Sequence, residues 1–448
     1  MPSVFMDPSG GPRWWRRRRW PLIAVAVVLV GAGVALAVYF AFVKRQGNVS
    51  HPNVEFTPTT PQKPKLVAET FKWPLYGYTP DRARYLNADI RPPYKEIWEY
   101  KSGSLIEFQP ILVNGVLYVV PNNGEARAID AKTGKKLWAH HVGSLNASSP
   151  AWANNRLFIT TLSGTFTCLN AKNGKRIWRR HLPSRSESSP LVLNGIVYFG
   201  SENGTVYALK QANGGKVWTY HAGGAVKGGI AYSKGLLYFG DYNGEVTALR
   251  AKDGKRIWRT GTSGGAFQQS GQFYSTPAVA NGRVYLGNTD HFVYSFAAHT
   301  GQLAWRYSTG YYVYSAAAVG PGPGGKPTVF IGSYDRTFYA FDARSGKVRW
   351  TFNAPGRISG APTLVGHVVY FSDLDSKQTT GLDARTGHPV FRFHSGKFNP
   401  VISDGRRIYL TGFSTVYTLV HASKPGRLPK KPKRKPAPHH KKPAKKHR

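Results

Sequence analysis

Sulfur and acid are both scarce in this sequence. Its 448 residues include one cysteine, Cys168, so no intrachain disulfide, four-cysteine zinc site or iron–sulfur cluster can form. The chain has 22 Asp+Glu against 61 Lys+Arg, which gives a formal net charge of +39 at pH 7. Such a chain is attracted to anionic polymers and membrane surfaces without a specific pocket.

Helical periodicity is absent outside residues 20–43. The chain is instead rich in residues that form turns and strands, with Gly 49, Tyr 25, Phe 23 and Trp 12. We therefore predict an all-β domain with almost no soluble helix. Cys168 lies in TFTCLN where a related segment, TVYALK, has Ala208, so we expect a buried core residue rather than a reactive thiol.

Residues 21–43 form a long apolar run, PLIAVAVVLVGAGVALAVYFAFV, without a charge. Its length fits the roughly 30 Å hydrocarbon core of a bilayer, which predicts a single-pass transmembrane helix. Arginines cluster before the run and only Lys44 and Arg45 follow it, so the basic residues 1–20 are expected in the cytoplasm and the rest outside the cell membrane. A cleaved signal peptide is the alternative, although its apolar region is normally shorter, about 7 to 15 residues.

Two polar segments flank the remaining domain, 73–422. Residues 44–72 are rich in Pro and Thr, which predicts an extended stalk. Residues 423–448 are rich in Lys and Pro and cannot bury a core, which predicts a disordered basic tail. We expect the tail to attach to anionic surface polymers or lipid headgroups, with a plain solubilising role as the alternative. Because the domain is expected outside the membrane, we expect no nucleic-acid partner.

A segment such as AIDAKTGKKLW, at 128–138, returns along the domain and ends each time on an aromatic residue. The closing residues are Trp98, Trp138, Trp178, Trp218, Trp258, Trp305, Trp350 and Phe391. Successive closures are mostly about 40 residues apart, and each unit holds four short strand-like runs. This period predicts an eight-bladed β-propeller, with a seven-bladed ring as the alternative.

We interpret the closing segment as a hairpin that closes each blade, rather than as part of an active site. Its Asp or Asn can accept hydrogen bonds from the turn, its Gly can take a positive φ, and its aromatic residue can pack on the neighbouring blade. The last unit lacks a fourth strand, so residues 90–100 are expected to complete the eighth blade from the other end of the domain. Ser and Thr at the starts of the inner strands are expected to face a wet central channel.

The motif A-x-D-A-x-T-G-x-x-x-W, the SSP strand starts and the opening phrase WPLYGYTPDRARY at 73–85 resemble the pyrroloquinoline-quinone-type (PQQ) repeat of quinoprotein-like propellers. The resemblance covers about residues 73–420. That family includes calcium- and quinone-dependent alcohol dehydrogenases, the propeller lipoprotein of the outer-membrane assembly machinery, and exported proteins of unknown role. The resemblance therefore implies the fold and leaves enzyme and binding module both open.

The dehydrogenases of that family hold the quinone in a funnel between outer and next inner strands, with Trp, a vicinal disulfide, carboxylates for Ca²⁺ and an Asp base. A single cysteine excludes the disulfide here. The corresponding connections carry only Glu107 and Glu187 as acids, apart from Glu99 on its strand. A calcium ion and a proton-abstracting base would both be poorly supplied. We therefore expect no cofactor, with PQQ and Ca²⁺ as the alternative.

Four histidines follow their closing aromatic residues by three positions. They are His141, His181, His221 and His394. Because blade rotation should hold them too far apart to share an ion at about 2 Å, we interpret them as edge residues rather than a metal site.

The enlarged connection at 260–277 and the segment at 308–315 are expected on one sector of one face, where loops on a rigid scaffold often bind partners. The candidate binding residues are Phe267, Gln268, Gln269, Phe273, Tyr274, Tyr311, Tyr312 and Tyr314. They would suit a peptide or glycan, and a loop that packs over the channel mouth is the structural alternative.

The sequence thus predicts a non-catalytic binding or scaffolding module of the bacterial cell envelope, anchored in the cell membrane. An envelope protein or an anionic surface polymer is the expected partner. The alternative function is that of a PQQ- and calcium-dependent dehydrogenase.

Overall fold

The computed structural model describes residues 24–34, 47–59, 64, 66–67, 69–262 and 271–422. A helix occupies 24–34. No helix in these ranges is both long and apolar enough to cross a membrane. The rest of the predicted span, 21–23 and 35–43, lies outside the described residues, as do the predicted N-terminal segment 1–20 and tail 423–448.

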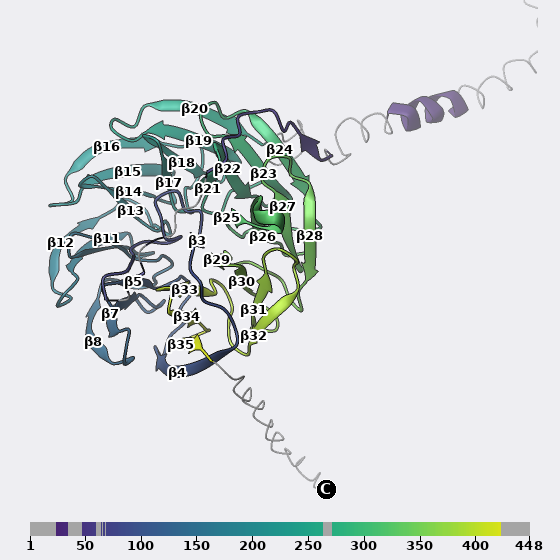
Figure 1. The fold of residues 1–448 in the computed structure, drawn as a ribbon. Helices are drawn as coiled ribbons and strands as arrows, with labels where there is room; N and C mark the ends of the chain where they lie inside the picture. The colour runs from purple at the N-terminus through teal and green to yellow at the C-terminus, as the bar shows by residue number, and fades with distance from the viewer. Residues whose placement is uncertain are drawn as a thin grey trace, which may run out of the picture.

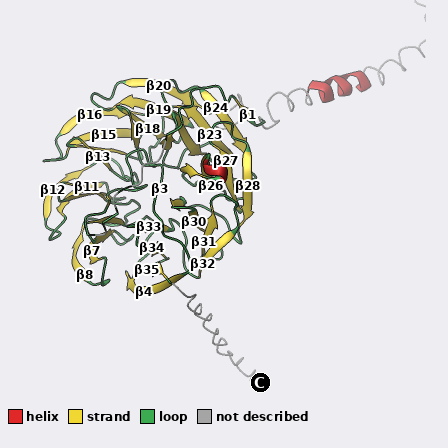
Figure 2. Cartoon of the chain, viewed as in Figure 1, coloured by secondary structure: helices red, strands yellow, loops and turns green. Residues whose placement is uncertain are grey.

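The described strands form eight sheets arranged radially around a central hub (Figure 1). The expected eight-bladed, all-β propeller is therefore confirmed, and the seven-bladed alternative is wrong. Each blade is an antiparallel four-stranded sheet, and strands and loops make up almost all of the ring (Figure 2). Apolar side chains of adjacent blades pack in shared clusters, so no blade buries both of its faces alone.

Blades one to four follow one another along the chain, each from the innermost to the outermost strand. Their strands are β5 (Ile111–Val113), β6 (Val116–Val119), β7 (Glu125–Asp130) and β8 (Lys136–His141); β9 (Ala151–Ala153), β10 (Arg156–Thr160), β11 (Thr165–Asn170) and β12 (Arg176–His181); β13 (Leu191–Leu193), β14 (Ile196–Gly200), β15 (Thr205–Lys210) and β16 (Lys216–His221); β17 (Ala231–Ser233), β18 (Leu236–Gly240), β19 (Glu245–Arg250) and β20 (Arg256–Gly261).

Blades five to seven continue the pattern. Their elements are β21 (Ala278–Ala280), β22 (Arg283–Gly287), β23 (Phe292–Ala297) and β24 (Leu303–Ser308); β25 (Ala318–Pro321), the short 3₁₀ helix η2 (Pro323–Gly325), β26 (Pro327–Gly332), β27 (Thr337–Asp342) and β28 (Val348–Asn353); β29 (Thr363–Val365), β30 (Val368–Ser372), β31 (Thr379–Asp383) and β32 (Pro389–Phe393).

The eighth blade closes the ring from both ends of the domain. It combines β33 (Val401–Ser403), β34 (Arg407–Thr411) and β35 (Thr415–His421) with β4 (Tyr94–Lys101), which pairs with β35 as the outermost strand. The predicted closure by residues 90–100 is thus confirmed. The joined ends leave no open seam at which the ring could unzip.

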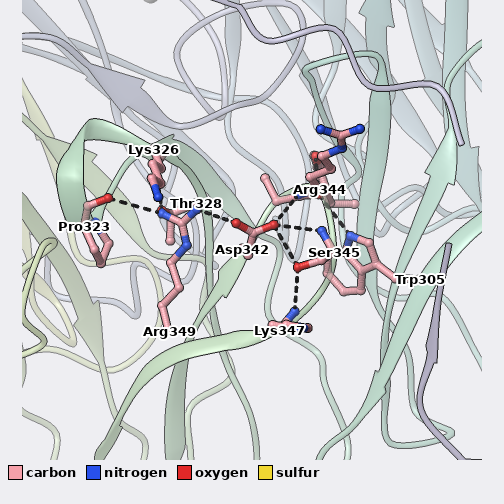
Figure 3. A network of polar contacts seen from close by, with 11 residues as sticks. Trp305, Pro323, Lys326, Thr328, Asp342, Arg344, Ser345, Lys347 and Arg349 are labelled. Carbon is pink, nitrogen blue, oxygen red and sulfur yellow. Dashed lines mark hydrogen bonds and ion pairs between the residues drawn. The ribbon is translucent and has the colours of Figure 1, made fainter. Parts of the chain in front are cut away.

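The closing hairpin has the turn chemistry that the repeat predicts. In blade six, Asp342 Oδ1 accepts hydrogen bonds from the backbone N–H groups of Arg344 and Ser345 at 3.0 and 2.8 Å, as Figure 3 shows. Asp342 Oδ2 also pairs with Arg349 at 2.6 Å. Gly346 follows with φ of 72° in the left-handed region, where an L side chain would be strained.

Each closing tryptophan packs over the glycine of the next blade's hairpin. A Cβ placed on Gly174 would lie 2.5 Å from the indole of Trp138. The Trp138 Nε1–H group donates to the Ala171 carbonyl at 3.0 Å. The indoles of Trp178, Trp218, Trp258, Trp305 and Trp350 donate in the same way to the next blade. Trp98 packs over Gly134, and Phe391 contacts Tyr94 of β4.

The segment around 71–86 runs across the hub and ties the blades together (Figure 1). It contains β2 (Lys72–Trp73), which pairs with β5, and β3 (Tyr85–Leu86), which pairs with β29. Carbonyls of Pro74, Pro80 and Ala83 accept hydrogen bonds from the inner strands of blades two, four and six. The PQQ-like opening phrase is therefore a hub element.

Part of the predicted stalk is docked on the ring rather than extended. The strand β1 (Val49–Ser50) pairs with the outermost strand β24 of blade five (Figure 2). Arg344 donates to the Pro52 carbonyl at 2.9 Å, and Arg283 donates to the carbonyls of Val54 and Glu55. Val54 and Phe56 pack on the apolar cluster between blades five and six, which the Pro/Thr-rich composition did not indicate.

Ser and Thr at the starts of the inner strands take two kinds of position: Ser189, Ser275 and Thr276 line a cavity at the hub, as expected of a channel wall, whereas other serines bond to the neighbouring blade. Ser149 is buried and its hydroxyl donates to the Gln109 carbonyl at 2.7 Å, and Ser188 donates to the Gly228 carbonyl at 2.9 Å. These bonds run from one blade to the next because the hub segment and the narrow ring bring neighbouring inner strands together.

Candidate functional site

One side of the hub opens into a cavity of about 400 Å³, which we call the mouth cavity. Its wall consists largely of the connections that lead from each outer strand to the next inner strand. At one equivalent position of these connections the blades contribute Glu107, Ala147, Glu187, Lys227, Tyr274, Tyr314, Ser359 and Lys397. All of them except Ala147 and Lys397 line the cavity. The repeat therefore places acidic, basic, aromatic and small side chains at equivalent positions around the mouth.

Glu187 and Lys227 form an ion pair inside the mouth cavity. Lys227 Nζ lies 2.7 Å from Glu187 Oε1 and 3.4 Å from Glu202 Oε1. Tyr274 donates a hydrogen bond to Glu187 Oε2 at 2.8 Å. Burial raises the pKa of Tyr274, and the Glu187 charge raises it further, so the phenol stays protonated and keeps donating. Both carboxylate oxygens of Glu187 are thus occupied by donors of the protein itself.

Glu107 is the second carboxylate of the cavity, and its negative charge has fewer protein partners than that of Glu187. Its Oε2 accepts a long hydrogen bond from Asn122 Nδ2 at 3.3 Å, and no ion pair within the described residues includes it. Burial raises the pKa of Glu107, the charge of Glu187 raises it further, and Lys397 lowers it. Lys397 Nζ lies 4.9 Å from the ring centroid of Phe413.

Four tyrosines line the cavity beside the Lys227 ion pair. The ring centroids of Tyr242 and Tyr274 are 6.3 Å apart, those of Tyr274 and Tyr314 are 5.8 Å apart, and those of Tyr314 and Tyr334 are 4.8 Å apart. These are contact distances for aromatic side chains. The rings therefore form a continuous aromatic surface across blades four to six.

The floor of the cavity is held by the hub segment. The Tyr76 ring lies 5.6 Å from that of Phe108, and its hydroxyl donates to Asn399 Oδ1 at 2.9 Å. Beneath it the Arg84 guanidinium lies 3.9 Å from the Tyr76 ring centroid. The floor is thus fixed by packing and hydrogen bonds from three distant parts of the chain.

The candidate binding residues fall into three groups. Tyr274 and Tyr314 line the cavity, and Tyr312 extends the aromatic wall with its ring 5.9 Å from that of Tyr314. Tyr311 follows Tyr312 at 4.4 Å and is 45% exposed. Phe273 does not belong to a binding face, because its side chain is fully buried in the blade-five core.

The remaining candidates, Phe267, Gln268 and Gln269, lie outside the described residues. Phe273 is buried because it fills the space over Gly240, where a Cβ would lie 2.4 Å from the Phe273 Cβ. The prediction of an exposed phenylalanine was wrong because the enlarged connection returns to the core at that point.

Three residues of the cavity wall were not predicted as candidates from the sequence: Lys227, Tyr242 and Tyr334. A signal for the tyrosines exists in the repeat. The residue two positions after the second strand of a blade is Glu202, Tyr242 or Tyr334 in blades three, four and six. These turns lie on the same side of the ring as the long connections, so aligning both positions together would have found the cavity wall.

A second candidate surface lies on the outer rim of blades one to four, on β8, β12, β16 and β20 (Figure 1). Two positions before each closing tryptophan stands an exposed cation; these are Lys136, Arg176, Lys216 and Arg256. The next residue is an exposed aliphatic one in each case; these are Leu137, Ile177, Val217 and Ile257. The equivalents of the cations on the other four blades are Leu303, Val348, Pro389 and Glu96. We call these four strands the basic rim.

The other residues of interest take structural positions. Cys168 is fully buried, as expected, and burial raises the pKa of its thiol to about 12, so it is not a reactive thiolate. His141, His181 and His221 end the outermost strands of blades one to three, and these three and His394 are exposed. The described residues contain no group of three potential metal ligands.

Comparison with known families agrees with the repeat. The profile of the family described as outer membrane protein assembly factor BamB matches residues 93–153, 122–227, 202–311 and 314–424. These matches cover most of the chain. The chain belongs to the BamB family.

Membership of the BamB family is accompanied by wide structural likeness. BamB from Moraxella catarrhalis is 17% identical, with a TM-score of 0.60 over 73% of this chain and 100% of that one. Quinohemoprotein alcohol dehydrogenase from Comamonas testosteroni is 16% identical, with a TM-score of 0.65 over 81% of this chain and 82% of that one. The computationally designed Ika8 protein is 14% identical, with a TM-score of 0.62 over 73% and 100%. At these identities the likeness shows the fold alone. No curated protein sequence matches the chain significantly.

The mouth cavity fits a calcium-bound quinone poorly. Its acids among the described residues are Glu107 and Glu187, and Lys227 already neutralises the latter. A hard cation at Glu187 would have to displace that ammonium. The described lining residues include neither a tryptophan on which a quinone could stack nor an aspartate base. We therefore derive no redox step for this site.

Proposed function

We propose that this BamB-family chain is a non-catalytic binding or scaffolding module of the bacterial cell envelope, anchored by residues 21–43 with the propeller outside the cell membrane. The observation that carries the non-catalytic part is the Lys227–Glu187–Tyr274 cluster. It occupies the best-placed carboxylate of the mouth cavity with protein donors at 2.7 and 2.8 Å. A carboxylate paired with an ammonium and a phenol is stabilised as the anion by the protein itself, which makes it a weaker base and a poorer metal ligand.

The scaffold itself supports a binding role. A closed ring, a tied hub and a fixed cavity floor hold the mouth loops on rigid strands, which is how loops acquire a defined recognition geometry. The family to which the chain belongs is named for outer-membrane protein assembly. An envelope protein at the mouth and an anionic surface polymer at the basic rim are the partners that these two surfaces suit.

The test measures both redox activity and partner binding in the same protein preparation. Full-length protein is given PQQ and Ca²⁺ and followed for a new absorbance band and alcohol-dependent dye reduction. In parallel it is crosslinked in envelope fractions, with Tyr312→Ala and Tyr314→Ala as mouth variants. We expect no dye reduction and a crosslinked partner that the mouth variants lose. Dye reduction that depends on Glu187 would instead establish the dehydrogenase.

Protease accessibility in intact and permeabilised cells tests the anchoring. The propeller is expected to be cut from outside and residues 1–20 to be protected. If residues 1–20 were cut from outside and the propeller were protected, the proposed location of the propeller outside the cell membrane would be wrong.

A further inference from the structure

We infer that the mouth cavity binds a primary ammonium group on an aliphatic chain, such as a lysine side chain, with Glu107 as its counter-ion and the tyrosines as its walls. This inference rests on the proposed binding function and names the chemistry of its ligand.

The first support is a group of the same kind that already lies in the cavity. The Lys227 ammonium is held by Glu187 at 2.7 Å and Glu202 at 3.4 Å, and it lies 5.4 Å from the Tyr242 ring centroid. Carboxylates and an aromatic face together stabilise ammonium ions. Lys227 thus shows that the carboxylates and tyrosine rings of this cavity can bind an ammonium group.

The second support is the state of Glu107. Glu107 lines the same cavity with one long hydrogen bond and no ion pair within the described residues. Lys397 lowers the pKa of Glu107 through its charge but forms no ion pair with it within the described residues, and its Nζ lies 5.2 Å from the ring centroid of Phe398 and 4.9 Å from that of Phe413. Burying a carboxylate without a counter-charge costs free energy, which an entering ammonium would offset.

The third support is the shape and polarity of the remaining space. About 400 Å³ exceeds what an ammonium alone requires, and the tyrosine wall suits the methylene groups that carry it. An anionic ligand is disfavoured because Lys227, the cation among the described lining residues, is already neutralised by Glu187 and Glu202.

Calorimetric titration of the full-length protein tests the inference with two probes that differ only by an acetyl group on Nε. Nα-acetyl-lysine methylamide carries the ammonium, and its Nε-acetylated form lacks it. We expect saturable binding of the first probe and at least tenfold weaker binding of the second. Equal binding of both probes, or binding of neither, would overturn the inference.

A matched pair of variants assigns the counter-ion. Glu107→Gln keeps the size of the side chain and its ability to accept a hydrogen bond but removes the charge. It should weaken the binding of the lysine probe at least tenfold. Glu99→Gln removes an equivalent charge from the exposed strand β4 and should leave binding unchanged. Unchanged thermal melting of both variants shows that they are folded. If Glu107→Gln binds the probe as tightly as the parent protein, Glu107 is not the counter-ion.

The outcome is separable from that of the proposed function. A protein that crosslinks to a partner but ignores the lysine probe refutes only the ammonium site. A protein that reduces dye with PQQ and Ca²⁺ refutes the proposed function, whatever the probe does.

Discussion

At the scale of single residues, two neighbouring arginines of the hub differ in how their buried charge is compensated. Arg82 and Arg84 are both fully buried. Arg82 donates to the carbonyls of Ile230, Ser189 and Pro190 at 3.0 to 3.2 Å, and also to that of Tyr76. Among the described residues, the three nitrogens of Arg84 have no hydrogen-bond partner of normal geometry, and the guanidinium stacks on Tyr76.

We therefore expect opposite outcomes for the same substitution at these two positions. Arg82→Met leaves several buried carbonyls without donors and should lower the free energy of unfolding by about 3 kcal/mol or more. Arg84→Met removes an uncompensated charge at similar volume and should change it by less than about 1 kcal/mol, or raise it. Urea unfolding of both variants measures the difference. Equal losses would show that Arg84 has a partner of comparable strength.

Asp290 is a residue whose ionisation should weaken the fold. Burial raises its pKa to about 6, although Tyr294, the Phe292 N–H group and Arg306 stabilise the charge. Between about pH 4 and 6 the folded state therefore binds more protons than the unfolded one, so stability falls as pH rises.

Asp290→Asn should remove this pH dependence. Relative to the parent protein, its free energy of unfolding should rise between pH 4 and pH 6.5 by up to about 3 kcal/mol. Asp375→Asn is the control, because Arg357 lowers the pKa of Asp375, so that its ionisation cannot make stability fall as pH rises. Urea unfolding at both pH values tests this, and parallel pH profiles of Asp290→Asn and the parent protein would contradict it.

At the scale of elements, the joint between blades depends on one glycine and one tryptophan. Gly174 has φ of 71° and lies under the Trp138 indole, whereas Gly195 has φ of 78° with nothing within 4 Å of a Cβ. Gly195→Ala should cost about 1 kcal/mol from backbone strain alone. Gly174→Ala should cost about 1 to 3 kcal/mol more, because the added methyl group displaces the indole.

The two glycine variants are compared by thermal unfolding, together with Gly174→Ala in a Trp138→Ala background. The second change should abolish the extra cost, since the methyl group then meets no indole. An extra cost that persists without the indole would place the strain elsewhere in the hairpin.

The elements that follow local rules could be predicted, and the site could not. Closing hairpins are encoded within a few residues, so the roles of Gly346 and Trp138 were predicted correctly. The completion of blade eight by β4 is a long-range pairing, and it could be predicted because the last repeat lacks a fourth strand. The pairing of Lys227 with Glu187 depends on which residues eight connections bring to one mouth. Docking of 47–59 depends on apolar contacts of Val54 and Phe56 that a Pro/Thr-rich composition conceals. Long-range packing decided each of these.

At the scale of the whole molecule, the basic rim places exposed cations at equivalent positions on four successive blades. Replacing Lys136, Arg176, Lys216 and Arg256 by Gln should lower the salt concentration that elutes the protein from immobilised polyphosphate. The slope of log affinity against log salt concentration should become shallower by up to about 3 if each of the four cations contacts a phosphate.

The control has the same change in net charge on blades six and seven. It replaces Lys326, Lys347, Lys377 and Arg392, which are also exposed. If net charge alone determined binding, both variants would elute at the same lowered salt concentration. A polyanion surface at the basic rim predicts a larger decrease for the rim variant. Equal elution of the two variants would refute the rim as a polyanion surface.

Docking of residues 47–59 restricts how far the ring can stand from a bilayer. If 21–43 crosses the membrane as proposed, residues 44–48 alone bridge the gap to β1, which extended chain limits to roughly 20 Å. Blades five and six would then face the lipid at close range, and blades one and two would point away from it across the ring. The positively charged edge would thereby be presented outward, toward wall polymers rather than headgroups.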